Sequence, residues 1–73
     1  MSTVGKILKT AREAKGLTAS ELAQRTRIKL QQVEGLERDD FSVSPAPMYS
    51  KGFLKLMAQE LDLNPAELLA RFE

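Results

Sequence analysis

Hydrophobic residues recur at helical spacing in five separate stretches of the chain, and no stretch is predicted to be a strand. The first predicted helix covers residues 4–15, and Gly16 follows it, as glycine commonly follows a last helical turn. Its apolar residues fall at i, i+3, i+4 and i+7, which is the spacing of one buried face: Val4, Ile7, Leu8 and Ala11. The pattern predicts an all-α fold.

The second and third predicted helices are short. The second begins at Thr18, because Thr18 and Glu21 have the spacing of a capping box, and it ends near residue 24 or 25. Leu17 precedes the cap and is placed to pack on Leu22 as a hydrophobic staple. The third helix spans residues 29–37 and carries its own apolar face: Leu30, Val33 and Leu36, with Ile28 leading in.

Residues 39–46 separate these three helices from the last two. Asp39-Asp40 signals a turn, and an extended loop is expected after it because Pro45 and Pro47 disfavour helix at the residues before them. The fifth helix begins at Asn64, with Asn as N-cap, Pro65 in the first helical position and Glu67 in the third. Its apolar face comprises Leu68, Leu69 and Phe72.

The fourth predicted helix, residues 47–61, has more apolar surface than one buried face needs. At 100° per residue its apolar arc is nearly twice the arc of about 100° that a surface helix usually shows. One part of the arc suits core packing: Leu54, Met57, Ala58 and Leu61. The surplus part consists of Tyr49, Phe53 and Leu56. Glu60 falls between Tyr49 and Phe53 in angle, which favours solvent near that flank. The opposite interpretation, that both aromatic residues complete a small core, stays open.

The amino-acid composition excludes several classes of function but adds little about the fold. A chain of 73 residues is one domain at most, and its hydrophobic content of 42% and charged content of 29% are those of a globular domain. There is no cysteine and no histidine, which excludes disulfides, thiolate chemistry and imidazole chemistry. The glycines are isolated and form no phosphate-binding loop. We therefore expect a non-enzymatic protein without a metal or other cofactor.

Charge and hydropathy give weaker guidance about partners and location. The net charge of +1 is too small to indicate nucleic acid binding by itself. The basic residues of the first helix are expected on its solvated face: Lys6, Lys9, Arg12 and Lys15. No apolar run approaches the roughly 18 residues of a membrane span, and the N-terminus lacks the apolar core of a signal peptide. A cytoplasmic location is expected.

Residues 4–38 resemble the Xre/Cro-type (lambda-repressor-like) helix-turn-helix unit. The matching positions are Ala11-Arg12, Lys15-Gly16-Leu17-Thr18, Glu21-Leu22-Ala23, Ile28, Val33 and Leu36-Glu37. In such units the third helix lies in the major groove, so the resemblance implies sequence-specific DNA binding as one possible function. The residues that would face the DNA are Lys29, Leu30, Gln31 and Gln32.

Several residues make that DNA-binding face a poor one. Leu30 offers a base edge no more than contact with a thymine methyl, and Glu34 brings a negative charge toward the phosphates. Ala19 stands where DNA-reading relatives usually have Gln. A solvated face is therefore preferred for this helix, and DNA binding is kept as the alternative.

The whole chain resembles the N-terminal cytoplasmic domain of RodZ-type bacterial cell-shape proteins, as a single five-helix domain over residues 1–73. The match adds two helices in residues 47–73 to the helix-turn-helix unit of residues 4–38. It rests on Thr26-Arg27-Ile28, Asp40-Phe41, Pro45-Ala46-Pro47, Tyr49, Lys51-Gly52-Phe53-Leu54-Lys55, Ala58, Leu61, Leu63 and Pro65-Ala66-Glu67-Leu68-Leu69. Met57 and Leu56 depart from the family pattern, which often has Tyr and a polar residue at these positions.

The resemblance implies a partner, an actin-like bacterial filament protein bound through the fourth helix. Tyr49 and Phe53 would supply the aromatic contact, with Lys51 and Lys55 as the nearest basic residues and Leu56 beside them. Membrane attachment would need a segment outside this chain. A homodimer formed through the same apolar surface is a third possibility.

Overall fold

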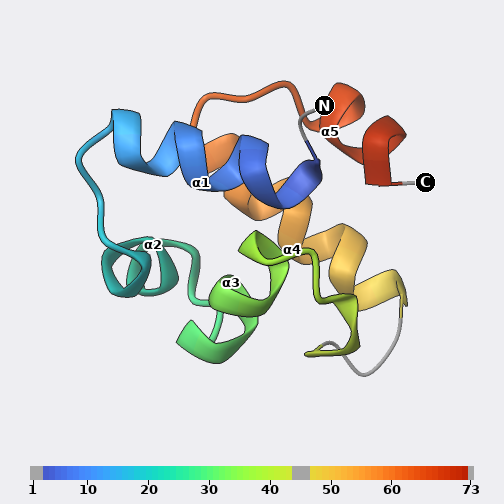
Figure 1. Cartoon of the computed structure of the whole chain (residues 1–73), viewed down its shortest axis with the longest axis horizontal. Helices are drawn as coiled ribbons and strands as arrows, with labels where there is room; N and C mark the ends of the chain where they lie inside the picture. The colour runs from blue at the N-terminus through green and yellow to red at the C-terminus, as the bar shows by residue number, and fades with distance from the viewer. Residues whose placement is uncertain (1–2, 44–46, 73) are drawn as a thin grey trace.

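The computed structural model describes residues 3–43 and 47–72, and all regular structure in these residues is helical (Figure 1). The elements in order are α1 (Val4–Ala14), α2 (Ala19–Thr26), α3 (Leu30–Glu37), the 3-10 helix η1 (Phe41–Val43), α4 (Pro47–Glu60) and α5 (Pro65–Phe72). The all-α prediction with five α-helices is confirmed. The predicted helix boundaries differ from these by one or two residues.

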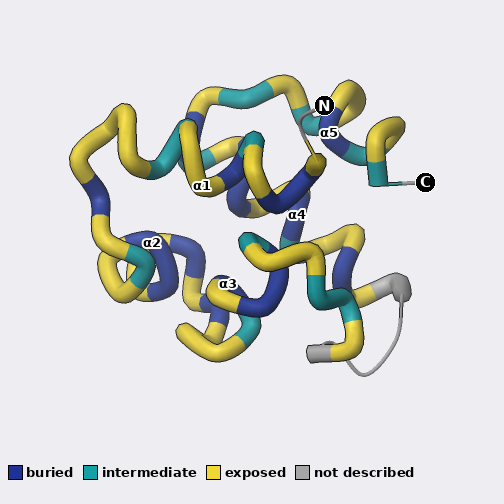
Figure 2. The backbone as a smooth tube through the Cα atoms, viewed as in Figure 1, coloured by how far each residue is buried: buried dark blue, intermediate teal, exposed yellow. Residues whose placement is uncertain are grey.

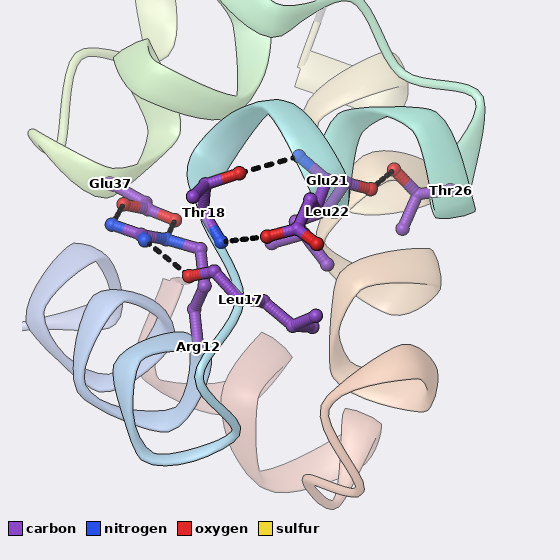
Figure 3. A network of polar contacts seen from close by, with 7 residues as sticks. All are labelled: Arg12, Leu17, Thr18, Glu21, Leu22, Thr26 and Glu37. Atoms are coloured by element: carbon purple, nitrogen blue, oxygen red, sulfur yellow. Dashed lines mark hydrogen bonds and ion pairs between the residues drawn. The ribbon is translucent and has the colours of Figure 1, made fainter.

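The predicted helix caps are present and explain where the helices begin. At α2 the backbone N–H of Glu21 donates to the Thr18 hydroxyl at 3.0 Å, and the Thr18 N–H donates to the Glu21 carboxylate at 2.9 Å (Figure 3). At α5 the Asn64 side-chain oxygen accepts from the backbone of Ala66 and Glu67. Lys29 precedes α3 and makes no side-chain cap, which agrees with its poor capping ability.

One continuous core joins the first three helices to α4. Leu8, Leu22, Val33 and Leu36 are fully buried, and so are Leu54, Met57 and Ala58 of α4. In Figure 1, α4 crosses behind α1 and α3, and Figure 2 shows dark, buried segments on the elements that surround it. The predicted packing face of α4 is therefore confirmed by burial.

The connection between α3 and α4 differs from the extended loop that was expected after Asp39-Asp40. Residues Phe41–Val43 form a turn of 3-10 helix, because the Asp40 carboxylate accepts hydrogen bonds from the backbone and the hydroxyl of Ser42. The Phe41 ring packs edge-on against Phe72 of α5, with 4.8 Å between ring centroids. The prediction that Pro45 enforces extended backbone concerns residues outside the described ranges.

The expectation that Arg12 lies on a solvated face is wrong. Its side chain is 12% exposed and forms a two-point ion pair with Glu37, which is 7% exposed (Figure 3). A third bond runs from the guanidinium to the backbone oxygen of Leu17 at 2.8 Å. Arg12 follows Leu8 by one helical turn, so it continues the buried stripe of α1 rather than leaving it. The pairing with Glu37 raises the pKa of Arg12 above its ordinary value.

The N-terminal turn of α1 is held against the end of α3 through Asp39. Asp39 has φ 61°, in the left-handed region, and its carboxylate accepts from the Gly5 N–H at 2.8 Å and from the Thr3 hydroxyl at 2.6 Å. A Cβ on Gly5 would lie 2.5 Å from the Glu37 carbonyl oxygen. Asp39 therefore marks a turn, as predicted, and also accepts from one of the free amides at the start of α1, that of Gly5.

A candidate docking face on helix α4

Three large apolar side chains form an exposed stripe along α4: Tyr49, Phe53 and Leu56. They follow one another at spacings of four and three residues, so they share one side of the helix. Tyr49 is 55% exposed and Leu56 is 45% exposed, while Phe53 is intermediate. The Tyr49 and Phe53 rings are neighbours, with centroids 6.4 Å apart and planes inclined by 36°.

The two aromatic residues differ in what they contribute to the fold. Phe53 is partly buried and packs against the hydrophobic core, so part of its ring completes that core. Tyr49 has no place in the core cluster and keeps more than half of its surface open. The interpretation of the pair as core residues therefore applies in part to Phe53 and not to Tyr49.

The two lysines proposed as a basic rim lie on another side of the helix. Lys51 and Lys55 are exposed. At 100° per residue they point about 160° and about 120° around α4 from Tyr49. The helix therefore does not bring them onto the Tyr49–Phe53 flank, although Lys55 lies closer to it than Lys51.

A shallow groove between α2 and α4 continues the stripe beyond Leu56. It is lined by Arg25, Thr26 and Arg27 at the end of α2 and by Leu56, Gln59 and Glu60 of α4. Arg25 forms an ion pair with Glu60 at 3.4 Å across the groove. These arginines were not predicted to border the docking face, because sequence periodicity relates residues within one helix and not between helices thirty positions apart.

The alternative DNA-binding residues are at the start of α3. Lys29 and Gln31 are exposed, Leu30 is 41% exposed and Gln32 is intermediate. Glu34 is exposed on the same helix, one turn further on. The structure thus leaves this end of α3 accessible, but the Glu34 carboxylate and the apolar Leu30 side chain share it with the polar residues.

The described residues contain neither a cluster of candidate metal ligands nor a helix that could cross a membrane. No group of three or more acidic side chains, the one available class of strong metal ligand, is placed to hold an ion there. None of the helices in residues 3–43 and 47–72 combines the length and the apolar character needed to cross a bilayer.

Comparison with known proteins assigns the chain to a family. A family model described as a helix-turn-helix domain matches residues 7–68. The chain therefore belongs to this helix-turn-helix family. It is also similar to the cytoskeleton protein RodZ of Streptococcus pneumoniae (strain ATCC BAA-255 / R6), with 37% identity over 71 residues. The resemblance to RodZ-type proteins is thereby confirmed.

The match covers nearly all of this chain but only part of the relative. It includes 97% of this chain but only 26% of the relative, so the chain spans about a quarter of that protein's length. No solved structure matches the chain. The relative's name connects it with the cytoskeleton, and the contacts made by this chain have to be inferred from its own surface.

Proposed function

We propose that the chain is a cytoplasmic, non-enzymatic docking domain that binds an actin-like cytoskeletal filament through the exposed stripe of α4. The observation that carries the proposal is the exposure of Tyr49 and Leu56 on a helix whose neighbouring face, with Leu54, Met57 and Ala58, is fully buried. The similarity to a cytoskeleton protein supports the choice of partner.

The physical case rests on the cost of leaving large apolar groups in water. Adjacent exposed apolar side chains on a small domain mark a contact site more often than an unused surface. Tyrosine is enriched among the residues that dominate binding energy, because its ring buries a large area with few rotatable bonds. Phe53 is anchored by the core on one side, so it holds the neighbouring Tyr49 ring in place at little entropic cost.

Co-sedimentation with polymerised actin-like protein encoded in the same genome tests the proposal. Tyr49→Ala should abolish or strongly weaken pelleting with the filament, and the double variant with Phe53→Ala should abolish it. Thr10→Ala, an exposed change on α1, serves as the matched control and should pellet like the wild type. Circular dichroism on each sample separates loss of contact from loss of fold. Unchanged pelleting of the folded Tyr49→Ala variant would refute the proposal.

Sequence-specific DNA binding through α3 is the competing function, favoured by the exposure of Lys29 and Gln31. It predicts an affinity that falls steeply with salt and is lost when Gln31 and Gln32 are both changed to alanine. A gel shift at two salt concentrations measures both properties. Absence of binding at micromolar protein would eliminate this function.

A homodimer through the same stripe is the remaining alternative. It predicts that Tyr49→Ala converts a dimer into a monomer in sedimentation experiments without any filament present. A wild-type chain that sediments as a monomer would eliminate it.

A further inference from the structure

Gly52 occupies the middle of α4, where glycine weakens a helix and the fold gives no reason for it. The residue is exposed, and a Cβ built at this position meets no atom within 4 Å. Glycine in a helix interior costs conformational entropy that alanine does not. Nothing inside the described structure therefore excludes a side chain at position 52.

Two other glycines show what an internal reason looks like. A Cβ on Gly5 would collide with the backbone of Glu37, and Gly16 adopts φ 71°, which disfavours any L side chain. Both are required by the fold itself. Gly52 meets neither condition, so no contact in the described structure explains a bare backbone at this point.

The position of Gly52 coincides with the proposed docking face. Tyr49 precedes it by three residues and Leu56 follows it by four, which places all three on the same side of α4. At Gly52 the helix backbone carries no side chain, and Tyr49, Lys55 and Leu56 are the neighbours one turn before and after it. We call this bare position the Gly52 notch. When two helices pack, a side chain of one helix inserts into the space between four residues of the other. A glycine among those four residues makes that space deeper.

We propose that the Gly52 notch is where a helix of the filament subunit approaches the α4 backbone and inserts one apolar side chain between Tyr49 and Leu56. This inference rests on the proposed function and identifies the centre of the contact. The close approach is possible only because position 52 has no Cβ.

The charges around the notch define the chemistry of the inserted segment. Lys55 borders the notch, and Arg25 and Arg27 line the groove that continues beyond Leu56. In the described residues neither Lys55 nor Arg27 forms an ion pair, and the acidic residue in the groove, Glu60, is already paired with Arg25. The facing helix should therefore carry Asp or Glu beside its apolar side chain, since opposite charges at the rim favour association.

Substitution of Gly52 separates effects on folding from effects on binding, because the melting temperature should rise while the affinity for the filament falls. Gly52→Ala should raise the melting temperature by roughly 4–8 °C, since it favours the helix and touches nothing. The same variant should bind the filament about tenfold more weakly, and Gly52→Leu should abolish co-sedimentation. Ala70→Leu, which adds a similar apolar group on the exposed side of α5, is the matched control and should bind like the wild type.

The charge part of the proposal has its own variant. Arg27→Glu should weaken binding to the filament, and the loss should be larger at low salt than at high salt because rim charges are screened. Arg27 is exposed and lies outside the core, so the variant should keep the wild-type circular dichroism.

These variants distinguish the proposal about Gly52 from the proposal that α4 is the docking face. Wild-type binding by both Gly52 variants, together with weak binding by Tyr49→Ala, would overturn the notch and leave the docking face intact. Wild-type binding by Tyr49→Ala would overturn both. A lower melting temperature in Gly52→Ala would show that the fold itself requires the glycine, which also overturns the inference.

Discussion

Arg12 and Glu37 form a two-point ion pair that joins α1 to α3, with Nε–Oε2 at 2.8 Å and Nη2–Oε1 at 2.9 Å. Both side chains are largely withdrawn from solvent, and the remaining guanidinium bond to Leu17 fixes the connection between α1 and α2. A planar guanidinium can satisfy all three acceptors at once, whereas an ammonium group cannot. The pair therefore sets the mutual position of the first three helices.

Removal of one partner should destabilise the protein strongly. Arg12→Ala leaves the buried Glu37 carboxylate unpaired, and we expect the free energy of unfolding to fall by about 3 kcal/mol. Arg12→Lys should recover only part of this, because it cannot make both bonds to the carboxylate. Urea denaturation followed by circular dichroism measures the change. Equal stability of Arg12→Lys and the wild type would contradict the role given to the two-point geometry.

Gly5→Ala should be destabilising for a steric reason. The added Cβ would lie 2.5 Å from the Glu37 carbonyl oxygen and 2.9 Å from the Asp39 carboxylate. Separating α1 from α3 to relieve the contact also stretches the Gly5–Asp39 hydrogen bond, so a loss of about 1–3 kcal/mol is expected. Thermal unfolding gives the measurement, and Gly52→Ala supplies a comparison with the same chemical change in open space. Loss of stability of equal size at both sites would refute this explanation.

The capping box of α2 should make stability depend on pH. Hydrogen bonds from Thr18, first from its backbone N–H, hold the pKa of Glu21 below its usual range. A carboxyl with a lowered folded-state pKa contributes stability above its unfolded pKa, and that contribution is lost as the pH falls through the folded value. Glu21→Gln keeps a capping side chain without the charge. The stability advantage of the wild type over this variant should shrink below about pH 4.3. An advantage that does not change between neutral and acidic pH would contradict the assignment.

The two faces of α4 should respond differently to truncation. Leu54 is fully buried, so Leu54→Ala should cost about 2–5 kcal/mol through lost burial and a cavity. Leu56 is 45% exposed, and Leu56→Ala should change stability by less than about 1 kcal/mol. Chemical denaturation of the two variants under one set of conditions makes the comparison. A large loss in Leu56→Ala would show that the stripe belongs to the core.

Local sequence signals predicted most of the fold. Helical spacing located all five α-helices, and the Thr18 and Asn64 caps placed two helix starts to within a residue, because these features depend on neighbours three or four positions away. The divided apolar arc of α4 also emerged from one helix alone. Its buried half is confirmed, and the docking role of its exposed half stays a prediction.

Local sequence signals could not predict contacts between segments that are distant in the sequence. The Arg12–Glu37 pair joins residues 25 positions apart, and the Asp39 bond to Gly5 spans 34. From one helix alone, a basic residue is expected to be exposed, because its partner on a neighbouring helix is unknown. For the same reason helical periodicity could not relate Arg25 and Arg27, at the end of α2, to the docking face. Lys51 and Lys55 were expected there because of the family resemblance.

The dissociation constant of the Tyr49→Ala variant for the polymerised filament protein tests the central claim most directly. Tyr49 lies outside the core cluster, so its removal should leave the melting temperature close to that of the wild type. Binding should weaken at least about tenfold, as expected for an aromatic residue that contributes much of the binding energy of an interface. An unchanged dissociation constant in a folded variant would contradict the claim that α4 is the docking face.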